Sequence, residues 1–258
     1  MEPSPSRPQP SAWSVEDLRL TLFPTPDSKF SSVGWWTKVV GDQPETAVSR
    51  PKTGGSDYYG PYEGGRLVLL DRMTRIDWHL TSLQTSLEGD GSQVVSVGPF
   101  PESSNLFLET MFRWFDVDDC PNAKRLGFGA FLVQPVESKE DGYRLIASYL
   151  PHVELDPSGS SEFLYQINRP RESRTGITGL KINRLSKWSV LVQTRALISV
   201  GPEGVSQDIS PSKHAGRLEL DINTRQDFDG TFARAALSEV FRELVDLGAE
   251  MASDGDIP

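Results

Sequence analysis

The sequence is poor in the residues that most often carry metal sites and covalent chemistry. Its 258 residues include one cysteine and three histidines. Cys120 has no second cysteine with which to form a disulfide inside the chain, which favours a reducing compartment such as the cytoplasm. No histidine lies near Cys120 in the sequence, so we interpret it as a small residue in a turn and not as a nucleophile.

Long hydrophobic runs are absent as well. The apolar runs are as short as Leu-Val-Leu-Leu at 67–70, whereas a membrane-spanning helix needs about 20 apolar residues. The N-terminal segment MEPSPSRPQPSAW has no apolar stretch of the kind found in a secretory signal. We therefore expect a cytoplasmic protein without membrane contact. The four prolines of that segment predict that residues 1–14 form a disordered tail.

The sequence also lacks the common catalytic motifs. It contains no P-loop, HExxH, CxxC or GxSxG pattern. The segment GFGAFL at 127–132 has two glycines of a dinucleotide fingerprint, but it lies within a strand pattern. Asp116, Asp118 and Asp119 are ligand types that Mg²⁺ prefers, but we favour their interpretation as a solvated loop after a helix. We assign no catalytic residue, no metal ligand and no cofactor, and an enzyme is not favoured.

One acidic pattern keeps a metal-dependent nuclease open as the least favoured alternative. Glu137 and Lys139 form an E-x-K unit about twenty residues after Asp119, an order in which carboxylates bind Mg²⁺ and the lysine orients water. In such nucleases the unit lies on a strand. Here Pro135 ends the strand pattern and Ser138 begins a helix pattern, which places both side chains on a solvated first turn.

Hydrophobic periodicity predicts an α+β fold with antiparallel sheets and helices packed on one face. In residues 15–122 we expect an alternating strand at 16–23, a short helix after Ser31 or Ser32 ending at Gly41, a long loop at 42–65, a hairpin at 65–80 and a helix after Ser103 or Ser104. In residues 123–258 we expect a strand from Ala123, a helix capped by Ser138, several strands and a closing helix at 231–252. The similar order predicts two related β-α-β(n)-α halves.

Three segments of the second half resemble a known family. They are KRLGFGAFL with the later GRLELDIN, and the terminal SEVFRELVDLGAEM. They resemble the second half of a sporadically distributed, uncharacterised prokaryotic protein family with an R-[IL]-G strand, an L-x-L-D-I-D strand and a closing helix. Asn223 stands where that pattern has its second Asp. The resemblance implies a prokaryotic accessory protein and brings no catalytic residues.

Charge is distributed unevenly along the chain. The net charge is −10, but between Arg169 and Arg195 seven basic residues accompany only Glu172, so this segment carries +6 and the remainder −16. The segment contains two I-N-R units, at 167–169 and 182–184. If their strands pair, the two asparagines and two arginines come together, and such groups bind carboxylates, phosphates or amides. The candidate contact residues of the hairpin 166–195 are Asn168, Arg169, Arg171, Arg174, Asn183, Arg184, Lys187 and Trp188.

The sequence therefore favours a non-catalytic binding or scaffolding subunit of a prokaryotic protein complex. Its contact surface would be the basic hairpin, with Tyr58 and Tyr59 from the 54–65 loop, because tyrosine is enriched at interface hot spots. A protein partner or a homo-oligomer is expected. A nucleic-acid-binding accessory protein that uses the same hairpin is the alternative. Equally, the arginines can pair with carboxylates of this chain, Trp188 can lie in the core, and the tyrosines can pack the loop.

Overall fold

The computed structural model describes residues 13–52, 54–83, 95–194, 196–201, 204–209 and 212–257, with side chains outside 195–211. Its helices are α1 (Trp35–Val40), α2 (Phe100–Phe115), α3 (Lys139–Tyr149) and α4 (Arg234–Asp254). Across the described ranges, no helix is long and apolar enough to cross a membrane. The expected tail falls largely on residues 1–12, which lie outside the described residues. Trp13, by contrast, is fully buried, and Ser14 begins a strand.

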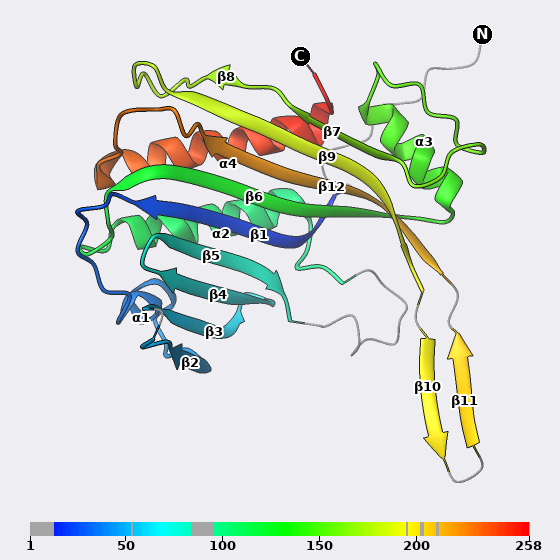
Figure 1. The fold of residues 1–258 in the computed structure, drawn as a ribbon, viewed down its shortest axis with the longest axis horizontal. Helices are drawn as coiled ribbons and strands as arrows, with labels where there is room; N and C mark the ends of the chain where they lie inside the picture. Colours follow the sequence, from blue (N-terminus) through cyan, green and yellow to red (C-terminus); the bar gives the residue numbers. More distant parts are fainter. Residues whose placement is uncertain are drawn as a thin grey trace.

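Ten strands form one antiparallel sheet in the order β2-β3-β4-β5-β1-β6-β12-β9-β7, with β8 paired to β9 (Figure 1). Together with the helices, this confirms the mixed α and β class. Two further strands, β10 (Ala196–Gly201) and β11 (Gly204–Ile209), pair with each other. The strands of the large sheet are β1 (Ser14–Pro24), β2 (Thr46–Ser49), β3 (Ser56–Tyr62), β4 (Gly65–Arg72), β5 (Arg75–Ser82), β6 (Ala123–Val136), β7 (Leu164–Asn168), β8 (Arg171–Glu172), β9 (Lys181–Gln193) and β12 (Lys213–Thr224).

The pairing of β1 with β6 joins the two predicted halves, 15–122 and 123–258, into one sheet. Leu20 of β1 lies opposite Phe128 of β6, and Phe128 lies opposite Ile222 of β12. All three side chains are fully buried. Alternate residues of a strand point to opposite faces, so this register places one apolar row on the same side of three neighbouring strands.

Helices α2 and α4 cover this apolar side, and in Figure 1 both run behind the strands. Phe241 of α4 meets Phe107 and Phe115 of α2 and Phe128 of β6, with ring centroids 5.9–6.3 Å apart. Gly248 allows close approach, because a Cβ at that position would lie 2.8 Å from the Phe128 ring. Helix α3 contacts β9 and β12. As expected, Ser138 caps it, its hydroxyl accepting from the Asp141 amide at 3.1 Å.

The loop expected at 42–65 is wrong, because the segment contains β2 and β3. Gly60 and Pro61 suggested a loop. In β3, however, packing requires the glycine, and the position of Pro61 tolerates a proline. A Cβ on Gly60 would lie 2.9 Å from the Trp36 ring, and β2 begins opposite Tyr59, so Pro61 needs no amide hydrogen on that edge.

Two expected helix starts are also wrong. Helix α1 begins at Trp35 and has no side-chain cap. Ser32, which we expected to cap it, instead donates its hydroxyl to Asp71 at 2.6 Å. Helix α2 begins at Phe100 with Pro101 in its first turn, three residues before the serines expected to cap it. Both serines, Ser103 and Ser104, lie buried inside the helix.

Candidate functional site

The two I-N-R units do lie side by side. Strand β7 pairs with β9, and the Arg169 amide donates to the Arg184 carbonyl at 3.1 Å. The Asn168 side chain donates to that of Asn183 at 3.1 Å and accepts from the Arg184 amide at 2.9 Å. The strands of the two units therefore pair and their asparagine side chains meet, whereas the two arginine side chains bind different carboxylates.

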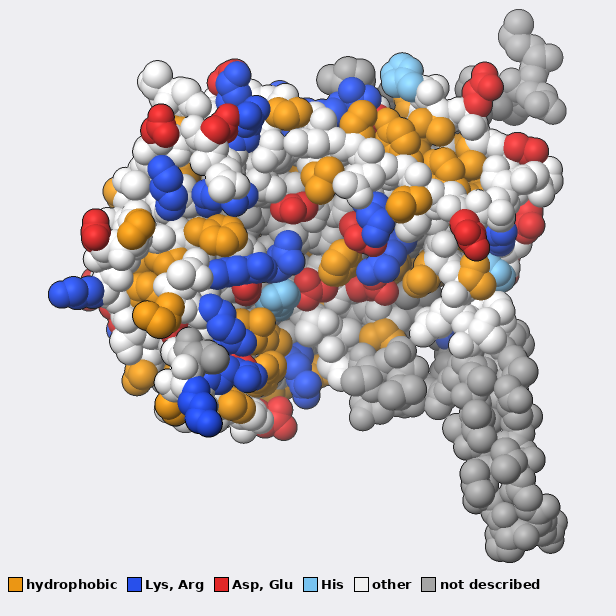
Figure 2. All heavy atoms as spheres, viewed as in Figure 1, with side chains coloured by type: hydrophobic (Ala, Val, Ile, Leu, Met, Phe, Trp, Pro, Cys, Tyr) orange, Lys and Arg blue, Asp and Glu red, His pale blue; other side chains and the backbone are white. Residues whose placement is uncertain are grey.

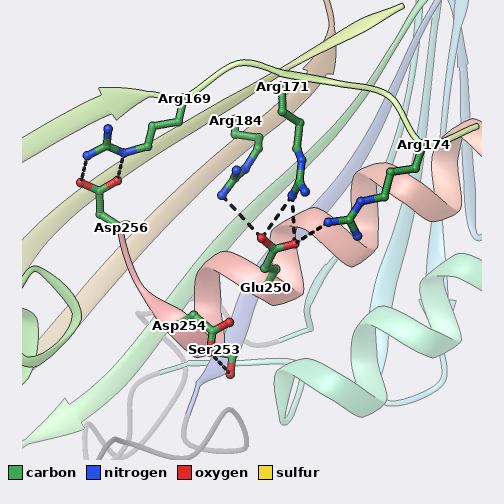
Figure 3. A network of polar contacts seen from close by, with 8 residues as sticks. All are labelled: Arg169, Arg171, Arg174, Arg184, Glu250, Ser253, Asp254 and Asp256. Carbon is green, nitrogen blue, oxygen red and sulfur yellow. Dashed lines mark hydrogen bonds and ion pairs between the residues drawn. The ribbon is translucent and has the colours of Figure 1, made fainter. Parts of the chain in front are cut away.

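The arginines of these units point toward α4, where they bind carboxylates of this chain (Figure 3). Arg169 donates from Nε and Nη2 to the two carboxylate oxygens of Asp256, whose side chain is 2% exposed. The hydrogen bond from Arg169 holds the pKa of Asp256 below its ordinary value. Tyr165 of β7 donates to the same carboxylate at 2.8 Å. This contact fixes the segment after α4 against the sheet.

Glu250 of α4 gathers three further arginines. Its carboxylate lies 3.2 Å from Arg171 and 3.9 Å from both Arg174 and Arg184 (Figure 3). Arg184 is 5% exposed, and burial lowers its pKa while the charge of Glu250 opposes that change. A guanidinium buried to this extent needs a neighbouring carboxylate. The arginines of the hairpin thus hold α4 to β8 and β9.

The remaining candidate residues divide between core and surface. Trp188 is fully buried against Tyr149, with ring centroids 5.3 Å apart, so it has no surface to offer a partner. Lys187 binds Glu219 at 3.1 Å on the other side of the sheet. Tyr58 and Tyr59 lie on β3 and not on a loop, with Tyr58 packed against the core and Tyr59 pointing to the opposite face.

The residues of the nuclease alternative do not meet. Asp119 lies before β6 and accepts from the Trp35 indole at 2.9 Å, whereas Glu137 follows the end of β6. Fourteen residues of extended strand separate them, a length of roughly 45 Å at the usual rise per residue. Within the part of the chain that the structure describes, no three His, Cys, Asp or Glu side chains are grouped as metal ligands.

A broad surface lies on the face of the sheet opposite the apolar row, and we call it the outer face. The strand registers align its side chains in three rows that cross β3 to β9, and most of the polar ones are half-exposed. Figure 2 shows hydrophobic, basic and acidic side chains interspersed over the sheet. The rows are Asp57, Leu70, Asp77, Thr21, Gly127, Asn223 and Asn183; then Tyr59, Val68, His79, Arg19, Gly129, Asp221, Leu185 and Asn168; then Pro61, Arg66, Thr81, Asp17, Phe131, Glu219, Lys187 and Gln166.

A hollow lies near the middle of the outer face, over Gly127 of β6, while the guanidinium of Arg19 covers the next outward glycine, Gly129. Its volume is about 120 Å³. The glycines leave the strand without side chains at two successive outward positions, so neighbouring strands form the walls. The lining residues are Arg19, Thr21, Phe23, Arg75, Arg125, Gly127, Asp221 and Asn223.

Side-chain amides connect the I-N-R asparagines to this hollow. Asn168 donates to Asn183, and Asn183 donates to Asn223 at 3.1 Å. Asn223 in turn donates to Asp221 at 2.9 Å and accepts from Arg125 at 3.3 Å. Because neighbouring residues on a strand face opposite ways, each I-N-R unit sends its asparagine to the outer face and its arginine toward α4.

Comparisons with models of known protein families, with curated proteins and with solved structures give no match. The hollow was also missed by sequence reasoning, because its residues come from β1, β5, β6 and β12 and have no common spacing. The available signal was G-F-G at 127–129, where alternate glycines predict that one face of a strand carries no side chains.

Proposed function

We propose that this protein is a non-catalytic binding subunit that receives a protein partner on the outer face of its sheet. The observation that carries the proposal is Arg19, which lies at the centre of that face without a polar partner among the described residues. Arg19 is half-exposed and only its Nε is shielded from solvent, so its other nitrogens are available as donors to a group from outside the chain.

The size and composition of the outer face support a protein partner. The three rows hold 23 residues, and stable interfaces use about 20 to 30 residues a side. Phe23, Tyr59 and Phe131 lie on this face among several arginines, and both residue types are enriched at interface centres.

Charge points to a partner with an acidic contact surface. The chain has 26 basic and 36 acidic residues, yet within and beside the three rows cations slightly outnumber anions. The cations are Arg19, Arg66, Arg72, Arg75, Arg125, Lys187 and Arg217, and the anions are Glu16, Asp17, Asp57, Asp77, Glu219 and Asp221. The outer face therefore repels a second acidic protein less than the net charge of −10 suggests.

In this proposal the basic hairpin supports the sheet and does not contact the partner, since its arginines bind Asp256 and Glu250.

We also propose that the two halves are related and that helices cover only the side of the sheet opposite the outer face. In support, β1 lies beside β5, the last strand before α2, and β6 lies beside β12, the last strand before α4. A duplicated unit of this kind doubles the width of the outer face.

Photo-crosslinking in the native host tests the proposal. A benzoylphenylalanine is placed at Leu185 or Phe131 on the outer face, and at Val33, which is 75% exposed before α1, as the matched control. We expect the same protein to crosslink from both outer positions and not from Val33, and to bind the purified chain. Equal crosslinking from Val33, crosslinks only to copies of this chain, or no crosslinks at all would each contradict the proposal.

A further inference from the structure

We infer that the hollow over Gly127, beside the guanidinium of Arg19, binds a single carboxylate group. This inference rests on the proposed function for the source of that group, which would be an aspartate or glutamate side chain of the protein partner. The hollow has four properties that suit such a group: the position of Arg19, the fixed positions of Arg75 and Arg125, its charge and its size.

Arg19 lies flat across β6. A Cβ on Gly129 would be 3.1–3.3 Å from Nη2, Nε and Cζ of Arg19, so the guanidinium covers the glycine. Among the described residues Arg19 has no hydrogen-bond or ion-pair partner, and its Nε is shielded from solvent. The two terminal nitrogens of an arginine can both donate to the oxygens of one carboxylate, and they are the donors of Arg19 that remain for a ligand.

The other two arginines are held in place beside it. Arg75 binds Asp77 through Nε at 2.7 Å and Nη2 at 2.9 Å, and Thr21 donates to the same carboxylate at 2.6 Å. Arg125 donates to the Thr224 carbonyl and to Asn223, both at 3.3 Å. Both guanidinium groups lie over the Phe23 ring, at 5.9 and 5.1 Å. A site fixed before binding loses little conformational entropy on binding.

The charge of the hollow matches a monoanion. Arg19, Arg75 and Arg125 contribute three positive charges, while Asp77 and Asp221 contribute two negative ones. One positive charge remains for a ligand. A phosphate monoester carries nearly two negative charges at neutral pH, and Asp221 in the wall would oppose the second.

The size of the hollow agrees with a small group. Its volume of about 120 Å³ corresponds to roughly four water molecules at their share of liquid volume. This space accommodates the end of an acidic side chain, which displaces the water. Gly127 contributes to the space because it places no side chain in the hollow, and Gly129 leaves room for the guanidinium of Arg19.

Titration of the purified full chain with sodium acetate tests the inference by NMR of the arginine Nε–Hε groups. We expect a saturable shift of the Arg19 and Arg125 signals, with half-saturation at roughly 10–100 mM acetate, a weak affinity suited to a single ion pair. Sodium chloride at equal ionic strength should produce no saturable shift. Sodium phosphate should bind no more tightly than acetate, and tighter phosphate binding would overturn the assignment to a carboxylate.

Arg19→Gln and Arg66→Gln are a matched pair, because both remove one positive charge from the outer face and Arg66 lies outside the hollow. Neither arginine has a polar partner among the described residues. We expect Arg19→Gln to weaken the acetate response of Arg125 at least ~10-fold and Arg66→Gln to leave it unchanged. If Arg19→Gln misfolds, Arg19→Lys replaces it in the test. Arg19→Lys keeps the positive charge and should retain part of the acetate response. Equal effects of the two Gln variants would overturn the inference.

The two proposals fail separately. If acetate binds in the hollow but no partner crosslinks from the outer face, the carboxylate site is supported and the proposed function is contradicted. If a partner crosslinks from Leu185 and Phe131 but Arg19 does not respond to acetate, the proposed function is supported and the carboxylate site is contradicted.

Discussion

Arg169 and Asp256 lie 87 positions apart in the chain and bind each other through two parallel hydrogen bonds. The pair connects the end of β7 to the segment that follows α4. Bidentate contacts between a guanidinium and a carboxylate are among the stronger polar contacts in proteins. The pair therefore marks a point at which the sheet and the last helix depend on each other.

Replacement of Asp256 should make stability less dependent on acid. The hydrogen bond from Arg169 lowers the pKa of Asp256 below the ordinary 3.8, so the folded chain binds fewer protons here than the unfolded chain. The stabilisation is present above about pH 4 and is lost as pH falls through the lower folded pKa. We expect Asp256→Asn to cost about 1–3 kcal/mol at pH 7 and progressively less toward pH 3, measured by urea unfolding.

Asp254→Asn is the control for this measurement. Asp254 is exposed at the end of the same helix, and its described contact is with the neighbouring Ser253 at 3.2 Å (Figure 3). It should change stability by less than about 0.5 kcal/mol at every pH. A difference between wild type and Asp256→Asn that stays constant from pH 7 to 3 would show that Arg169 does not act through the charge of Asp256.

Replacement of Glu250 on α4 should destabilise the chain more than replacement of Glu172, an exposed acidic residue of the basic hairpin. Glu250→Gln removes the carboxylate nearest to Arg171 and the nearly buried Arg184. We expect a loss of about 1–3 kcal/mol in the free energy of unfolding. Glu172→Gln breaks only the exposed pair with Lys181, which should contribute at most about 1 kcal/mol. Equal losses in denaturant unfolding would contradict the role given to Glu250.

Cys120 should react slowly in the folded chain. It is 6% exposed, and burial raises its pKa from 9.0 to about 12. At pH 8 that difference lowers the thiolate fraction roughly 1000-fold. We expect iodoacetamide to label the native protein at least ~100-fold more slowly than the urea-unfolded protein, followed by mass spectrometry. Labelling at similar rates would mean that Cys120 is accessible and ionised, and would contradict its interpretation as an unreactive residue in a turn.

Local patterns predicted those elements whose signals lie within a single segment. Leu18, Leu20 and Leu22 alternate in β1, Ser138 caps α3, and the stripe from Leu237 to Met251 lies in α4. Strand β3 was missed because its glycine and proline are explained by Trp36 and by the start of β2, which are distant in the sequence. Packing there overrides propensity.

The candidate site was predictable only in part, for the same reason. The pairing of the I-N-R strands followed from their spacing, but the fate of each side chain depends on which face it occupies. Asn168 and Asn183 join the outer face, while Arg169 and Arg184 meet carboxylates in and just after α4 that lie more than 60 positions away. Arg19 carried no signal at all, since an arginine in an alternating strand is ordinarily solvated.

The central position of β6 has a consequence for synthesis of the chain. Its partner β1 is made first, but the strand that covers its other edge, β12, begins 77 residues after β6 ends. At ~5–20 residues per second, that edge waits about 4–15 s on the ribosome. The segment FGAFLV at 128–133 is apolar and uncharged, and such an edge pairs readily with other chains. The nascent protein must pass through this interval before its sheet is complete.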